Sequence, residues 1–111
     1  MKKTLITALA LTVGLTATAQ KRAFTIEDVY RVQSVSSPTV AKDGTLAYST
    51  SSSDLKTQKS TSNIWVMNKS GKGQPTAITT NGKSYEPTSS QDAKTLYFCS
   101  SVNGAVQLFK Y

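Results

Sequence analysis

Two kinds of hydrophobic pattern follow one another along this chain. Residues 4–17 are mostly apolar or small, whereas from residue 38 onward short runs of apolar and polar residues alternate. Alternation with a period of two is typical of strands that bury one face, and Gly, Asn, Asp and Ser between the runs indicate turns. The pattern therefore predicts an apolar leader followed by an all-β domain.

The leader has the three parts of a secretory signal peptide. Met1-Lys2-Lys3 is a short positive segment, residues 4–17 are the apolar core, and Ala17 and Ala19 are small residues at the positions that signal peptidase reads. The apolar core is shorter than the roughly 20 residues that a membrane-spanning helix needs. We therefore expect residues 1–19 to be a signal peptide cleaved after Ala19, a periplasmic or extracellular protein, and no stable membrane anchor.

A lead segment and one short helix are predicted for residues 20–37. Thr25 is a good N-cap, and Asp28 stands three residues later, in the capping-box position. Apolar side chains then recur at the i, i+3, i+4 spacing of a helix face. The members of that face are Ile26, Val29 and Tyr30. The helix is expected over residues 25–32, and the segment at residues 34–38 is expected to terminate it.

Four short strands are predicted between residues 38 and 80. Their cores are residues 40–41, 45–50, 63–68 and 75–80, and Lys42-Asp43-Gly44 is a turn signal. In the second strand Leu46 and Tyr48 alternate with smaller or polar neighbours, as expected of a half-buried strand. Residues 51–62 hold five Ser, two Thr and two Lys, so they are predicted to form a loop.

The pattern then restarts. Pro38-Thr39 recurs 49 residues later as Pro87-Thr88, residues 42–49 match residues 91–98 with a one-residue slip, and Ile64-Trp65 is echoed by Leu108-Phe109. A four-strand unit that recurs every 40 to 50 residues is typical of β-propeller blades. The chain is therefore predicted to be a partial β-propeller of about one and a half blades of four-stranded antiparallel sheet.

In this assignment residues 38–80 form the first blade and residues 81–111 an incomplete second blade. Tyr111 falls near the end of the third strand of that second unit, so we expect a longer parent protein and weak stability of the chain alone. Asp92-Ala93 replaces the Asp-Gly of the first turn. Ala93 lacks the easy positive φ of glycine, which predicts a less well encoded hairpin in the second unit.

Charge and composition exclude several functions. The chain has 13 basic and 6 acidic residues, but the lysines are spread through turn-like sequence, which is typical of soluble sheet proteins and not of nucleic-acid binding. There is no His, so the chain offers no imidazole base for a Ser-His-Asp or Cys-His arrangement. We predict no catalytic residue, no cofactor-binding residue and no metal ligand.

The remaining reactive side chains have structural interpretations. The serines in polar runs are expected to be solvated, and the acidic residues to stabilise the helix start or the turns. Lys69 to Gly73 is expected to form a hairpin turn, and the lone cysteine to be a buried inert thiol. The aromatic residues are expected to pack between sheets and not to stack on a ligand. These residues are Ser51 to Ser53, Glu27, Asp28, Asp43, Asp92, Cys99, Tyr48, Trp65, Tyr97, Phe98 and Phe109.

The order of these signals resembles the start of exported bacterial peptidases of the prolyl oligopeptidase family, namely the dipeptidyl-peptidase V and acylaminoacyl-peptidase-like members. The propeller of that family typically begins with a short helix, a Ser-Pro-Asp-Gly-Lys strand pair, an Ile-Trp-Val strand and a Leu-Thr strand. This chain departs from the second of these motifs, because Ala41-Lys42 stands where Ser-Pro is usual. The segments that carry the resemblance are residues 25–32, 38–48, 62–68, 77–79 and 87–98.

The resemblance implies a propeller that gates access of substrates to a C-terminal α/β-hydrolase domain, which these residues do not include. The expected partner is a peptide substrate, reached only through that missing catalytic domain. Asp-Gly repeats also occur in TolB-like periplasmic propellers, which bind protein partners and catalyse nothing, so a fragment of such a propeller is the alternative. A third hypothesis is a small exported β-protein that self-associates through its exposed strand edges.

Overall fold

The computed structural model describes residues 22–111, and the predicted signal peptide at residues 1–19 lies outside the described residues. The chain is mainly β, as the sequence predicted, with one short helix and two antiparallel sheets. The helix α2 spans Ile26–Arg31. The first sheet has the order β1 (Ser34–Val40), β2 (Leu46–Asp54), β3 (Lys59–Met67) and β4 (Thr76–Ala77). The second has the order β5 (Ser84–Ser89), β6 (Leu96–Ser100) and β7 (Gln107–Lys110).

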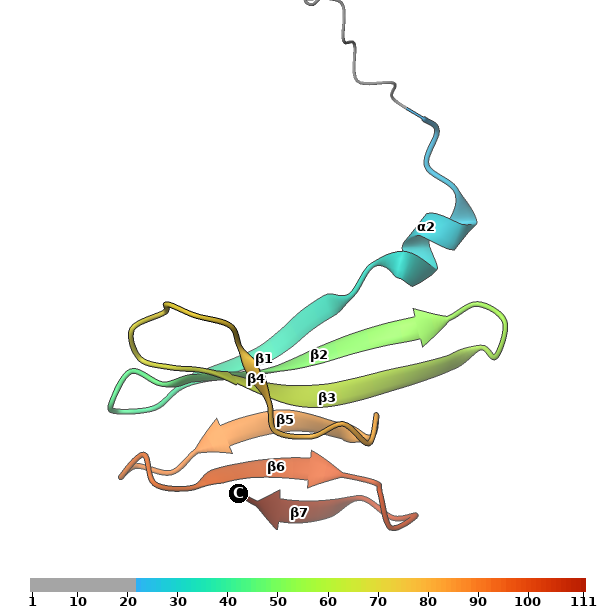
Figure 1. The fold of residues 1–111 in the computed structure, drawn as a ribbon. Helices are drawn as coiled ribbons and strands as arrows, with labels where there is room; N and C mark the ends of the chain where they lie inside the picture. Colours follow the sequence, from blue (N-terminus) through green and yellow to red (C-terminus); the bar gives the residue numbers. More distant parts are fainter. Residues whose placement is uncertain (1–21) are drawn as a thin grey trace, which may run out of the picture.

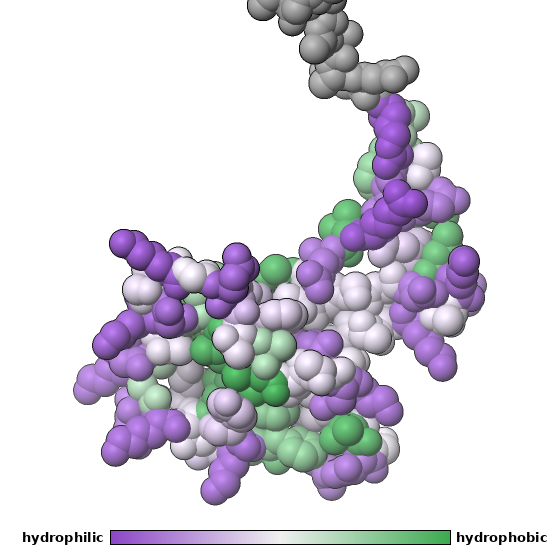
Figure 2. Space-filling model, in the orientation of Figure 1, coloured by the Kyte–Doolittle hydropathy of each residue, from purple (hydrophilic) through white to green (hydrophobic). Residues whose placement is uncertain are grey.

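The two sheets lie against one another, with the second below the first in Figure 1, and α2 lies beyond the end of β1. The buried apolar residues between them come from both sheets: Ala47, Ile64, Leu96 and Phe98. Ile64 is fully buried, which contributes about 1.5–3 kcal/mol relative to an exposed side chain. In Figure 2 the hydrophobic residues gather toward the middle of the visible face, with hydrophilic ones around them.

These contacts define two inner faces. On β2 the inner side chains are Ala47 and Ser49, and the Ser49 hydroxyl accepts a hydrogen bond from the Glu86 backbone amide of the second sheet at 3.1 Å. Leu46 and Tyr48 alternate with these residues, as predicted for a half-buried strand. They lie on the outer face and are only half-buried. Small side chains at the inner positions let the second sheet approach closely.

The predicted loop at residues 51–62 is also wrong. Its two ends continue β2 and β3 into a long hairpin, with Ser51 paired to Ser62 and Asp54 paired to Lys59. Hydroxyl pairs cross between the strands at 3.2 Å for Ser52–Thr61 and 2.8 Å for Ser53–Ser60. A strand this polar is stable here because its backbone is paired and its side chains reach water or each other.

The two sheets repeat one pairing pattern. In each, a register shift interrupts the pairing of the first two strands beside a proline, Pro38 or Pro87, and the preceding residue has a positive φ. These residues are Ser37 at 51° and Glu86 at 53°. Bulges of this kind kink a strand where proline cannot donate to the ladder. Because the first bulge belongs to a paired strand, β1 begins at Ser34, earlier than predicted.

Corresponding positions are 49 residues apart in the first strand of each sheet, 50 in the second and 44 in the third. Tyr48 pairs with Trp65 as Phe98 pairs with Phe109, and Ser49 pairs with Ile64 as Cys99 pairs with Leu108. The one-residue slip falls at the turn. The Ala41 amide bonds to the Thr45 carbonyl, and the corresponding Ser90 amide bonds to the Thr95 carbonyl, so the second turn is one residue longer.

The backbone conformation of that turn is left-handed in both copies, at Gly44 (φ 90°) and at Ala93 (φ 59°). An L-residue pays for this conformation through its Cβ, whereas glycine does not. We expect Ala93→Gly to stabilise the second hairpin by about 1 kcal/mol, which slows hydrogen exchange of the Ser90 amide about fivefold.

The matched control is Gly44→Ala. The added Cβ would lie 3.3 Å from the Lys69 Cβ at a φ of +90°, so exchange of the Ala41 amide should become faster. Faster exchange of the Ser90 amide in Ala93→Gly would contradict the strain at this turn.

Candidate functional site

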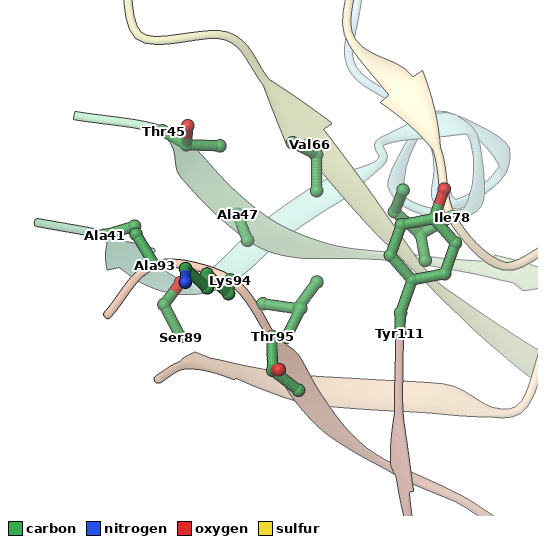
Figure 3. Close-up of a pocket in the computed structure, with 11 residues that line it drawn as sticks. Ala41, Thr45, Ala47, Val66, Ile78, Ser89, Ala93, Lys94, Thr95 and Tyr111 are labelled. Atoms are coloured by element: carbon green, nitrogen blue, oxygen red, sulfur yellow. The ribbon is translucent and has the colours of Figure 1, made fainter. Parts of the chain in front are cut away.

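An apolar cleft opens between the two sheets at the end where their first turns lie. Its volume is about 190 Å³, and its wall is made by Ala41, Thr45, Ala47, Val66, Ile78, Ser89, Ala93, Lys94, Thr95, Leu96 and Tyr111. In Figure 3 the Tyr111 ring, directly after β7, points toward Ile78, directly after β4, and Val66 and Ala47 point into the space between the two sheets. The cleft borders the buried cluster, because Ala47 and Leu96 belong to both.

The chemistry of this cleft is that of a contact surface. Lys94 is the charged side chain among the lining residues, it is exposed, and no carboxylate, cysteine or histidine lines the space. The hydroxyls of Thr45, Ser89 and Thr95 have no neighbouring base among the lining residues that could activate them. The cleft can hold an apolar side chain, and its lining supplies no acid–base pair.

The serines singled out in the sequence lie on β2. Ser51 pairs in the β2–β3 ladder, and the hydroxyls of Ser52 and Ser53 bond to Thr61 and Ser60. The expectation of a loop was wrong, but the hydroxyls do lie in polar surroundings. None of these bonds joins a serine to a titratable group.

The two adjacent acids at the helix start, Glu27 and Asp28, have different surroundings, since Glu27 is exposed. Asp28 is buried and its carboxylate accepts hydrogen bonds from the Thr25 amide at 2.9 Å and from the Arg22 guanidinium at 2.6 Å and 2.5 Å. The capping box is therefore present as predicted, whereas the ion pair with Arg22 carried no signal in the sequence. Both contacts hold the pKa of the Asp28 carboxyl well below its usual range, the guanidinium more than the amide.

The turn acids behave as predicted. Asp43 accepts the Thr45 amide at 2.9 Å, and Asp92 accepts the Lys94 amide at 3.1 Å and the Ser90 hydroxyl at 2.6 Å. Hydrogen bonding to the charged form lowers the pKa of both carboxyls, through the Thr45 amide at Asp43 and the Ser90 hydroxyl at Asp92. They lie one in each turn and are turn builders, as Asp commonly is.

The aromatic residues divide between the two faces of each sheet. Phe98 is buried and stacks on Phe109 with ring centroids 5.8 Å apart, which confirms core packing for this pair. Trp65 lies on the outer face of the first sheet and donates from Nε1 to the Thr50 hydroxyl at 2.9 Å. Tyr97 is 38% exposed on the outer face of the second sheet.

Cys99 lies on the same outer face as Tyr97 and is half-buried, so the prediction of a buried thiol was wrong. The reason is that β6 turns its Leu96 and Phe98 side toward the first sheet, which leaves the alternate residues outside. Sequence alternation identifies the two sets and does not say which set is covered.

Within residues 22–111 no group of three or more His, Cys, Asp or Glu side chains is placed to hold a metal ion. The described helix is too short to cross a bilayer. No protein-family model and no curated protein matches this chain. The cleft and the outer faces, which depend on how two sheets pack, were not found by reading the sequence.

Because its pKa is lower in the folded chain than in the unfolded one, Asp28 stabilises the helix start above pH ~4, and this contribution is lost as the pH falls through the lowered pKa. We expect the ¹³C carboxyl resonance of Asp28 to titrate well below the roughly pH 3.9 of a free aspartate. Asp28→Asn should remove the helical Cα shifts of residues 26–31.

Glu27→Gln is the control, since Glu27 is exposed and accepts no hydrogen bond from Thr25 or Arg22 among the described contacts. An Asp28 that titrates at its free value while the helix persists would show that neither Arg22 nor the Thr25 amide contributes.

Proposed function

We propose that this chain is the non-catalytic N-terminal propeller segment of an exported serine exopeptidase that resembles the prolyl oligopeptidase family. In this proposal the segment helps to gate the access of peptide substrates to a catalytic domain elsewhere in the parent. The segment itself binds no cofactor and no nucleic acid. Its place is the periplasm or the extracellular space, after cleavage at Ala19.

One observation carries the proposal, namely that two successive sheets repeat a single pairing pattern. Each begins with a bulge beside a proline, turns through an Asp-supported left-handed residue, and pairs a second strand with a third at matching positions. Sheets of one pattern that pack face against face are the building principle of a propeller. The family resemblance of the same segments supports the peptidase assignment.

The exposure of the outer faces supports a longer assembly. Ile64 is 0% exposed on the inner face of the first sheet, whereas its counterpart Leu108 on the second sheet is 71% exposed. The same position of the repeat thus carries an apolar side chain in both sheets. A neighbouring sheet covers it in the first sheet and not in the second. A further blade in a parent protein would cover the second.

The alternative is a fragment of a TolB-like propeller that binds protein partners. The Asp-supported turns at Asp43 and Asp92 favour it equally, because they occur in both kinds of propeller. The two hypotheses differ in whether the parent continues into a hydrolase domain.

The coding sequence downstream of Tyr111 in the genome of origin distinguishes them. We expect further blades followed by a Gly-x-Ser-x-Gly segment. Further blades with no such segment would favour the non-enzymatic propeller. A stop codon followed by unrelated sequence would overturn both and leave the small self-associating β-protein.

The chain itself should hydrolyse neither dipeptidyl nor acyl-aminoacyl p-nitroanilide reporters, because its sequence contains no histidine to activate a serine. The measurement is release of p-nitroaniline at neutral pH with and without a fluorophosphonate. Release that the fluorophosphonate blocks, from a preparation with a single labelled band at the mass of this chain, would contradict the non-catalytic role.

A further inference from the structure

Strand positions that are equivalent in the repeat face inward in one sheet and outward in the other. On the second sheet the outer positions are Tyr97, Cys99 and Leu108, and their counterparts on the first sheet are Ala47, Ser49 and Ile64. Those three are inner residues with exposures of 1%, 1% and 0%. The outer face of the second sheet therefore presents the same strand positions as the surface on which the second sheet lies, with the larger Tyr97 in place of Ala47 and Cys99 in place of Ser49.

The converse holds for the first sheet. Its outer positions Leu46, Tyr48 and Trp65 correspond to Leu96, Phe98 and Phe109, which pack inward on the second sheet. Two exposed valines extend this outer face along β1, Val35 at 66% and Val40 at 68%, paired with Thr50 and Leu46. Inside the chain, the inner face of the first sheet packs on the inner face of the second. The outer face of the second sheet corresponds to the former, and the outer face of the first sheet corresponds to the latter.

We propose that copies of this chain associate head to tail, with the outer face of the first sheet of one copy packed on the outer face of the second sheet of the next. The packing inside the chain is the template for this contact, and the face residues are predominantly apolar. On the outer face of the second sheet, Lys110 pairs with Tyr97 and is the charged residue among those named. No acidic or basic residue lies among the outer residues named on the first sheet. The occupant is a second copy.

This contact joins two different faces, so it is heterologous and leaves one free face of each kind on a dimer. It therefore differs from pairing of strand edges, and from a symmetric contact between two identical faces. The inference rests on the repeat in the structure and does not depend on a peptidase parent. If a parent protein covers the same faces with its own blades, the separated chain still carries both.

The test uses two substitutions that each disable one face. Leu108→Glu charges the outer face of the second sheet, and Val40→Glu charges the outer face of the first. Both side chains are largely exposed, so neither change disturbs the buried cluster. Sedimentation velocity over a concentration series should show dimers and larger species for the unmodified chain. Each variant should raise the apparent dissociation constant at least tenfold.

Mixing the two variants provides the decisive measurement. Leu108→Glu leaves the outer face of the first sheet intact, and Val40→Glu leaves the outer face of the second sheet intact. An equimolar mixture should therefore form a one-to-one dimer, which cannot add further copies because both of its free faces are charged. A symmetric contact would be lost in one variant and unaffected in the other. Either that result, or a mixture that stays monomeric, would overturn the proposal.

Gln107→Glu is the matched control, because it places the same charge on the adjacent residue of β7, an exposed position whose side chain lies on the opposite face. It should leave association unchanged, and an effect equal to that of Leu108→Glu would indicate edge pairing instead. Should a glutamate variant lose its strand signal in circular dichroism, Leu108→Thr and Val40→Thr keep strand propensity and test the same faces.

Discussion

The contact between the inner faces of the two sheets is the interaction on which the rest of this structure depends. An isolated sheet gains stability by burying an apolar face, and each sheet here covers the inner face of the other. Ile64 and Ala47 from the first sheet meet Leu96 and Phe98 from the second, and Ser49 adds a hydrogen bond to the Glu86 amide. The small side chains at Ala47 and Ser49 set how closely the sheets approach.

Three residues with a strained backbone lie in the bulges and the turn of these sheets. Ser37 and Glu86 hold positive φ values where β1 and β5 bulge beside their prolines, and Ala93 does so in a turn where the first copy has glycine. Each costs on the order of 1–3 kcal/mol, which persists only where the surrounding pairing determines the conformation. At Glu86 the amide that bonds to Ser49 belongs to the bulge, so this strained residue also joins the two sheets.

Equivalent positions in the two sheets have different surroundings. Ile64 and Leu108 occupy the same place in the repeat, yet one is fully buried and the other is 71% exposed. The acids of the described residues that have lowered pKa values are engaged by turns or by the helix cap. The association that we propose would cover Leu108 with a second sheet, as Ile64 is covered here.

The sequence by itself determined the local features of this protein. Short-range hydrogen bonds form the capping box at Thr25 and Asp28 and the turns at Asp43 and Asp92. The order of residues along the chain identifies Leu108-Phe109 as the counterpart of Ile64-Trp65. These are encoded within a few residues of where they act.

Only the tertiary structure decided which side of each strand is covered. β2 carries Leu46 and Tyr48 on one face and Ala47 and Ser49 on the other, and hydrophobicity alone favours the wrong face. The polar hairpin at residues 51–62, the half-buried Cys99 and the cleft between the sheets follow from the same choice. The physical reason is that alternation defines two faces of a strand, whereas the position of the neighbouring sheet selects between them.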